Sequence, residues 1–348
     1  MTSSDDAGVT GPLRSDEPDP DARAVLAKQA ERSDGPIAEV TLGRLRAGFD
    51  ADPVHRVPEP TPMASVENLS VPGGDEAVDL SARVYRPLSD AGDANRDDGD
   101  SQSTVLVYFH GGGWVVGSLD SHDELCRVLA RESGATVVSV AYRRAPEHPF
   151  PEPVADACAA TEWVADNARR LIGDRDGVSV SSEEPRLVVA GDSAGANLAA
   201  AVGLWARDRR RDGESAPELD RQLLIYPTVS RRNDWDSLTE NGEGYGLDRP
   251  DMRWFGDQYF GHDLDRYHPY ACPLEATDLG DLPPASVVTC GFDPLRDEGI
   301  AYAEALAESG VGVTHHHYPD QIHGAASMLG EWSVPAGRTI LTDVAGDL

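Results

Sequence analysis

The sequence RLVVAGDSAGANLAAAV, residues 186–202, joins a short apolar run to an alanine-rich helical stretch through GDSAG. GDSAG is a GxSxG pattern, in which a serine occupies a strained strand-to-helix turn and presents its hydroxyl. Gly191 and Gly195 leave room there for the close approach of neighbouring backbone. The pattern alone is common, but a strand before it and a helix after it favour Ser193 as a nucleophile over a plain turn at a helix start.

On both sides of this segment, short apolar runs alternate with longer helical stretches. Runs rich in branched and aromatic side chains fit strands that are buried on both faces. The expected strands are 105–109, 136–140, 186–190, 222–226 and 285–289, and the expected helices are 123–133, 154–168, 194–207 and 297–309. This alternation predicts an α/β fold with a mostly parallel central sheet flanked by helices.

The first part of the chain has a different character. Residues 1–20 are acidic and interrupted by Pro and Gly, without the positive start or apolar stretch of a secretory signal peptide, and we expect a disordered lead-in. Residues 21–50 have the apolar spacing of two short amphipathic helices, interrupted at Gly35-Pro36.

Two further segments connect this part to the alternating core. The runs 64–71 and 80–85 flank the turn signal Pro72-Gly73-Gly74 and predict an antiparallel hairpin. Residues 88–103 contain almost nothing that could be buried and predict a solvated loop.

The bulk charge of the chain is strongly negative. Its 348 residues include 61 acidic and 30 basic residues, for a formal net charge of -31, and Lys28 is the only lysine. Nucleic acid and anionic membranes are therefore disfavoured partners. Such a surface repels itself in ordinary salt, whereas at molar salt the Debye length shrinks to about 3 Å. The pattern resembles halophilic archaeal proteins and predicts adaptation to high salt; the alternative is an acidic protein from an ordinary cell.

Other bulk features exclude several classes of protein. No apolar run approaches the roughly 18 residues of a membrane span, so we expect a soluble protein. The cysteines are far apart and include no CxxC pair, which predicts neither a zinc site nor a disulfide framework. We expect each to be a small buried apolar residue in a reducing cytoplasm. They are Cys126, Cys158, Cys272 and Cys290.

A glycine-rich segment, LVYFHGGGW at 106–114, predicts an oxyanion hole. It consists of an expected strand followed by His110 and three glycines, whose backbone N–H groups can approach a substrate closely. We assign Gly112 and Gly113, together with the N–H of Ala194 at the helix start, as donors to a developing negative charge. Gly111 is expected to serve the turn.

A serine nucleophile needs a histidine base and a carboxylate that orients it. In this fold the chain order is nucleophile, acid, histidine, so both partners must follow Ser193. Asp293 comes just after the strand 285–289, where loops face the site of an open α/β sheet. Asp297 and Glu298 are rival acids, although acidic residues in the first turn of a helix also complement its dipole.

The C-terminal part of the chain contains several histidines that could act as the base for Ser193. The segment 311–318 alternates like a strand, and consecutive residues of a strand point to opposite faces. His315, His316 and His317 therefore cannot all reach one metal ion, and no metal site is predicted. His323 lies beyond this strand on a loop and is the expected base. Asp192, beside the nucleophile, is expected to make a structural hydrogen bond instead.

Six motifs in a fixed order resemble the bacterial and archaeal hormone-sensitive lipase family of esterases. The motifs are HGGGW, YRRAPEHPFP, GDSAG, HPYACPL, GFDPLRDEG and IHG. The resemblance implies an α/β-hydrolase fold with 61–348 as catalytic domain. It implies a cap made by 21–60 and an insertion near 230–262, where several aromatic residues break the strand–helix alternation.

The resemblance also implies a function. The family's Ser-His-Asp triad falls on Ser193, His323 and Asp293. Its members typically hydrolyse short- to medium-chain acyl esters without a cofactor, and many form homodimers. Together with the charge, this predicts a protein similar to a haloarchaeal carboxylesterase.

Three positions depart from the family's usual pattern, and two other functions stay open. Ala196 stands where Gly is frequent, Arg144 where Leu is usual and Ala325 where an aromatic residue is common. None of these changes removes a catalytic group. One alternative is a ligand-binding relative without catalysis, although such receptors commonly lack the histidine. The other is an amidase or peptidase, because the triad does not distinguish esters from amides.

Overall fold

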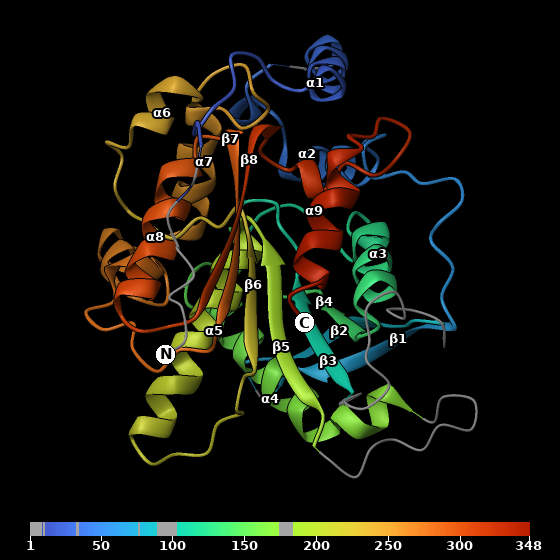
Figure 1. Cartoon of the computed structure of the whole chain (residues 1–348), viewed down its shortest axis with the longest axis vertical. Helices are drawn as coiled ribbons and strands as arrows, with labels where there is room; N and C mark the ends of the chain where they lie inside the picture. Colours follow the sequence, from blue (N-terminus) through green and yellow to red (C-terminus); the bar gives the residue numbers. More distant parts are fainter. Residues whose placement is uncertain (1–8, 10, 33–34, 76, 89–102, 174–183) are drawn as a thin grey trace.

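The computed structural model describes residues 9, 11–32, 35–75, 77–88, 103–173 and 184–348 (Figure 1). Most of the expected loop at 88–103, and the part of the expected lead-in at 1–8 and 10, lie outside these residues.

An eight-stranded sheet forms the centre of the molecule. Its strands are β1 (Ser65–Pro72), β2 (Asp79–Arg86), β3 (Thr104–Phe109), β4 (Thr136–Val140), β5 (Arg186–Asp192), β6 (Arg221–Ile225), β7 (Ala285–Phe292) and β8 (Val313–Ile322). Their order is β1-β2-β4-β3-β5-β6-β7-β8. β1 and β2 form the predicted antiparallel hairpin, β2 is antiparallel to β4, and the remaining neighbours are parallel. The prediction of a mostly parallel sheet is confirmed.

Helices cover both faces of the sheet, as Figure 1 shows. On one face lie α4 (Glu152–Ile172), α5 (Ala194–Arg211) and α8 (Arg296–Glu308), and on the other lie α3 (Asp123–Ser133) and α9 (Ala336–Ala345). β3, β4 and β7 are buried along their whole length, because side chains on both of their faces enter an apolar cluster. α9 is the one helix of the two layers that the sequence patterns did not predict.

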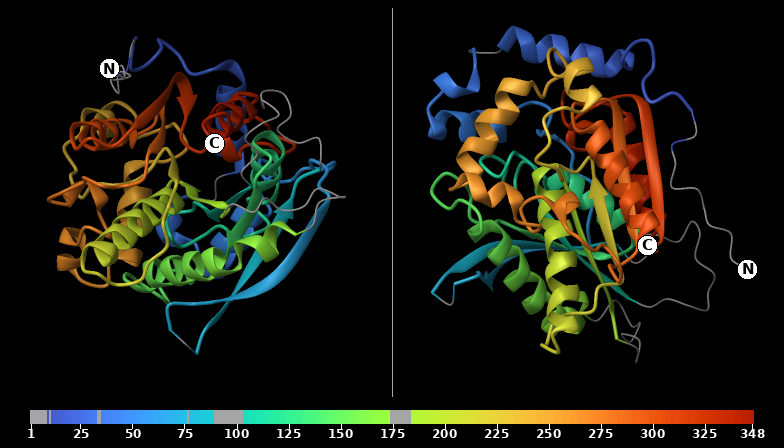
Figure 2. Two further views of the ribbon diagram at one scale, coloured as in Figure 1. Left: turned by 60° about the horizontal axis from the view of Figure 1, so that its bottom comes forward. Right: turned by 90° about the vertical axis from the view of Figure 1, so that its left-hand side faces the viewer.

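A second group of helices gathers at one end of the sheet. α1 (Pro20–Arg32) and α2 (Leu42–Asp50) come from the N-terminal part, and α6 (Asp236–Glu240) and α7 (Arg249–Tyr259) come from the segment between β6 and β7 (Figures 1 and 2). Short 3-10 turns complete the fold at Ile37–Glu39, Asp263–Tyr267, Pro273–Glu275 and Ala325–Ser327. The two segments that were expected to form a cap thus lie at the same end.

The described part of the lead-in differs from the expectation of disorder. The backbone N–H groups of Ser15 and Asp19 donate to the carbonyls of Pro319 and Asp320, at the end of β8. The guanidinium of Arg14 lies 4.3 Å from the centre of the Phe292 ring. These contacts fix residues 13–19 along β8, so the prediction of a disordered segment is wrong there.

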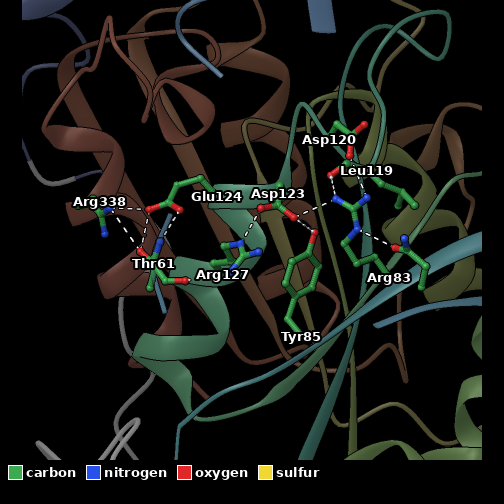
Figure 3. A network of polar contacts seen from close by, with 10 residues as sticks. Thr61, Arg83, Tyr85, Leu119, Asp120, Asp123, Glu124, Arg127 and Arg338 are labelled. Carbon is green, nitrogen blue, oxygen red and sulfur yellow. Dashed lines mark hydrogen bonds and ion pairs between the residues drawn. The ribbon is translucent and has the colours of Figure 1, made fainter. Parts of the chain in front are cut away.

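A polar network fastens the hairpin and the C-terminal helix to the start of α3 (Figure 3). Its central acceptors are the carboxylates of Asp123 and Glu124. The donors are Arg83 and Tyr85 of β2, Arg127 of α3, Thr61, and Arg338 of α9. Because Glu124 is buried, its hydrogen bonds offset the cost of removing a carboxylate from water.

The four cysteines are free and buried, as the sequence predicted. Within the described ranges, no cluster of His, Cys, Asp and Glu could hold a metal ion. None of the helices in these ranges is long and apolar enough to cross a membrane.

Candidate active site

Ser193 occupies the sharp turn between β5 and α5. Its backbone has φ 54° and ψ -118°, and residues other than glycine rarely adopt such a positive φ. A Cβ atom on Gly195 would lie 1.9 Å from the carbonyl oxygen of Phe109. A Cβ on Gly191 would lie 2.4 Å from the carbonyl carbon of Gly195. Both glycines are therefore required for the turn, for the reason that the GxSxG pattern suggested.

The structure brings together the three residues that were expected to form a triad. The Ser193 hydroxyl lies 3.0 Å from Nε2 of His323, and Nδ1 of that ring lies 2.8 Å from Oδ2 of Asp293. Since the Asp293 carboxylate can only accept, Nδ1 carries the proton and Nε2 is left to accept the serine hydroxyl. Asp293 is fully buried, and its other oxygen accepts the N–H of Leu295 at 2.8 Å.

The sheet explains why these distant residues meet. Ser193 directly follows β5, Asp293 directly follows β7, and His323 directly follows β8. Because these strands are parallel, their carboxyl ends share one edge of the sheet.

The two rival acids have other partners. Asp297 accepts the N–H of Ser237 at 2.7 Å and pairs with the guanidinium of Arg296. Glu298 is buried and accepts the N–H of Val229 at 2.7 Å. Burial raises the pKa of Glu298 to about 8, against the lowering effect of its hydrogen bonds. Of the three carboxylates, only Asp293 is within hydrogen-bond distance of His323.

The glycine loop after β3 faces the same site. Gly112 and Gly113 have φ values of 113° and 57°, so neither could readily be another residue. Among the described residues, the N–H groups of Gly112, Gly113 and Ala194 donate to no backbone carbonyl. A Cβ on Gly113 would lie 2.4 Å from the ring of Phe255 in α7, so the insertion packs directly on this loop.

A cavity of about 1210 Å³ opens onto these groups. Its inner wall includes Gly112, Gly113, Ser193, Ala194 and His323. The outer walls come from α1, α2 and the segment 228–260. Ser193 and the three candidate oxyanion donors therefore line one cavity that could admit a small molecule.

The three consecutive histidines alternate between the faces of β8, as predicted. His315 and His317 both lie 2.8 Å from Oγ1 of Thr289, whereas His316 lies 2.9 Å from Asp347. They do not converge on one point.

One positioning contact, made by Arg46 of α2, was not predicted from the sequence. Its guanidinium donates to the carbonyls of Val115 and Ala145 at 2.8 and 2.9 Å, and to both oxygens of Glu147 at 2.8 and 2.7 Å. Val115 lies in the loop that follows the glycines. α2 is thereby fastened beside the candidate oxyanion hole, through one arginine that no local pattern distinguishes from the others.

This contact predicts a pH dependence of stability. The hydrogen bond from Arg46 lowers the pKa of Glu147 from 4.5 to about 2. A lowered pKa means that the ionised form stabilises the fold, so this contribution is complete above pH 4.5 and is lost as the pH falls toward 2. We expect Glu147→Gln to lower Tm at pH 7, with a difference from the wild type that shrinks steadily below about pH 4.5. Thermal melts followed by circular dichroism measure this difference in Tm at each pH. A difference in Tm that does not change with pH would contradict the prediction.

Comparison with known proteins places the chain in a family. A family model described as an alpha/beta hydrolase fold matches residues 106–327, from β3 to just beyond His323. The chain belongs to the α/β-hydrolase family.

Its relatives include several esterases. Carboxylesterase NlhH of Mycobacterium tuberculosis is 40% identical over 289 residues, which cover 82% of this chain and 81% of that protein. Esterase LipI of the same species is 39% identical over 294 residues, covering 84% and 82%. Among solved structures, a hyperthermophilic esterase from Pyrobaculum calidifontis superposes with a TM-score of 0.78 at 37% identity, covering 95% of this chain and 97% of that one.

Proposed function

We propose that this chain is a serine carboxylesterase that hydrolyses short- to medium-chain acyl esters through an acyl-enzyme. The observation that carries the proposal is the position of His323, within hydrogen-bond distance of both the Ser193 hydroxyl and the Asp293 carboxylate. The names of the related esterases also support it. No step of this reaction requires a metal ion or a cofactor.

The first half of the proposed reaction acylates the serine. Oγ of Ser193 attacks the ester carbonyl carbon while Nε2 of His323 takes the hydroxyl proton. The carbonyl electron pair moves onto the oxygen, which accepts hydrogen bonds from the N–H groups of Gly112, Gly113 and Ala194. When this pair returns, the bond to the leaving alcohol breaks, and His323 gives its proton to the departing oxygen.

The second half releases the acid. A water molecule loses a proton to Nε2 of His323 as its oxygen attacks the acyl carbon, and the same donors hold the new oxyanion. Collapse breaks the bond to Oγ of Ser193, which takes the proton back. Asp293 stays ionised throughout and keeps the proton of the ring on Nδ1.

The two segments above the site form a cap in this proposal. Residues 21–60 and the insertion near 230–262 both contribute walls of the cavity. The indole of Trp114 stacks on the ring of Tyr259 with centroids 4.1 Å apart, which fastens the insertion to the glycine loop. The cap thus shapes the space for the acyl and alcohol groups.

The substrate class is tested with p-nitrophenyl esters from acetate to palmitate. We expect the maximum of kcat/KM between acetate and octanoate, as the resemblance to the hormone-sensitive lipase family of esterases implies. The butyrate ester and its matching p-nitroanilide serve as a pair, and faster cleavage of the anilide would favour the amidase alternative. A maximum at palmitate would rule out the short-chain preference.

We also propose that the protein is adapted to high salt. The formal net charge of -31 on 348 residues, with a single lysine, supports this. At low ionic strength the carboxylates repel one another across the folded surface, and salt screens that repulsion. We expect Tm at pH 7 to rise by more than about 10 °C between 0.1 and 3 M KCl, with activity retained at the higher concentration.

A control separates charge repulsion from general salting-out. The isoelectric point of the sequence is near 4.5. If repulsion is the cause, the same change in KCl should shift Tm far less at that pH, because the net charge is then close to zero. A protein that is equally stable at both salt concentrations at pH 7 would be an acidic protein without halophilic adaptation.

A further inference from the structure

The side chain of Asp192 connects the two halves of the proposed oxyanion hole. Asp192 is the last residue of β5 and is buried. Its Oδ1 atom accepts the N–H of Gly111 at 2.9 Å and the hydroxyl of Tyr108 at 2.6 Å. Nε2 of His122 lies 3.3 Å from Oδ2. The structural hydrogen bond expected from the sequence is present, and its partner is the glycine loop.

The placement of Asp192 in the chain gives this bond its significance. The Ala194 N–H, one proposed donor, lies two residues beyond Asp192 on the same turn. Gly112 and Gly113, the other donors, directly follow Gly111. A Cβ on Gly111 would lie 2.4 Å from Oδ2 of Asp192, so the carboxylate packs closely against the backbone of the loop. One side chain therefore links the donor on α5 with the donors after β3.

The surroundings keep Asp192 an acceptor. Burial opposes its ionisation, but the nearby His122 and the hydrogen bonds from Tyr108 and Gly111 lower the pKa of Asp192 to about 2. The neighbouring groups are fixed as well, because Nδ1 of His122 lies 3.0 Å from the Ser121 hydroxyl. The bond to the Gly111 N–H is thus held in a buried polar cluster, next to Tyr108 and His122.

We infer that Asp192 is a positioning residue for the oxyanion hole, whose hydrogen bond to Gly111 fixes where the N–H groups of Gly112 and Gly113 point relative to Ser193. The inference rests on the proposed esterase function. Asp192 acts through the loop, because its carboxylate bonds to Gly111, Tyr108 and His122 and not to Ser193 Oγ. Its loss should weaken stabilisation of the transition state while leaving ground-state binding nearly intact.

The test compares Asp192→Ala with Asp192→Asn in hydrolysis of p-nitrophenyl butyrate. Alanine removes the acceptor, and we expect kcat to fall about 100-fold with KM within about threefold of the wild type. Asparagine keeps an oxygen in reach of Gly111 and Tyr108, so its kcat should stay within about tenfold of the wild type. If Asp192→Ala does not fold, Asp192→Ser replaces it, since the serine hydroxyl is too short to reach the loop. Tyr108→Phe, which removes only the second donor, should cost about threefold or less.

Two further readouts separate positioning from a general loss of structure. Active sites are first counted by titration with a p-nitrophenyl alkylphosphonate, so that kcat refers to folded enzyme. The inhibition constant of a butyl trifluoromethyl ketone, which places an oxyanion in the hole, should then rise in parallel with the loss of kcat/KM. If the role of Asp192 were purely structural, its loss would lower Tm and the number of active sites. The kcat per active site and the inhibition constant of the ketone would then stay unchanged.

The outcomes are decisive in both directions. A loss variant that keeps kcat per active site and the affinity for the ketone within about threefold would overturn the inference. So would an asparagine variant as defective as alanine, because the negative charge and not the acceptor would then matter. A wild-type protein that hydrolyses no ester would refute the proposed function instead, which keeps the two failures distinguishable.

Discussion

Ser193→Ala is expected to lower kcat for p-nitrophenyl butyrate by about 10⁴- to 10⁶-fold. The reason is that the hydroxyl is the only group on the sharp turn after β5 that lies 3.0 Å from Nε2 of His323. Without it no acyl-enzyme can form, and any residual rate comes from water attack aided by the oxyanion donors. The variant should fold normally, because Ser193 Oγ donates no structural hydrogen bond other than that to His323 among the described residues.

A matched control makes this result specific. Ser230→Ala removes another serine hydroxyl that lines the same cavity, and we expect its kcat to remain within about threefold of the wild type. A phosphonate ester should add its mass to the wild type and to Ser230→Ala, but not to Ser193→Ala. Equal hydrolysis by the wild type and Ser193→Ala would remove Ser193 from the mechanism.

The residues of the site differ in how far the sequence alone could identify them. GDSAG and HGGGW are local patterns, and each places its glycines where a turn excludes a Cβ atom, so short-range sterics suffice to locate Ser193, Gly112 and Gly113. Asp293 and His323 needed more, namely a correct prediction of the parallel strands that they follow. The structure confirms these parallel strands, and β7 and β8 bring both residues to the edge at which β5 ends.

Long-range contacts were harder to predict. Arg46 fastens α2 to the loop that contains Val115, which lies 69 residues further along the chain. No residue near Arg46 in the sequence indicates this contact. Residues 13–19 are mostly polar and looked disordered, but two of the contacts that hold them are backbone hydrogen bonds to β8, which any sequence can make. For α9, in contrast, a signal existed: Ile340, Leu341 and Val344 have the spacing of one buried helix face.

Asp293→Asn is expected to lower kcat by about 10⁴-fold with little change in KM. The amide group of asparagine would donate to Nδ1 of His323 in place of the carboxylate, which now lies 2.8 Å from that atom. The ring proton would then move to Nε2, and Nε2 could no longer accept the proton of Ser193. The side chain has nearly the same shape, and its oxygen can still accept the N–H of Leu295, so the loss should occur with only a small decrease in Tm. Steady-state kinetics and thermal melts together measure it.

Asp297→Asn is the control that decides between the neighbouring carboxylates. Asp297 lies four residues further on, but its oxygens bind Ser237 and Arg296 and do not contact His323. We therefore expect Asp297→Asn to lower Tm, because its ion pair is lost, and to change kcat by no more than about threefold. If Asp297→Asn lowered kcat as much as Asp293→Asn does, the assignment of Asp293 as the acid of the triad would be contradicted. If instead only Asp293→Asn slows both hydrolysis and labelling by the phosphonate, the carboxylate acts by orienting His323, since both reactions require the same activated serine.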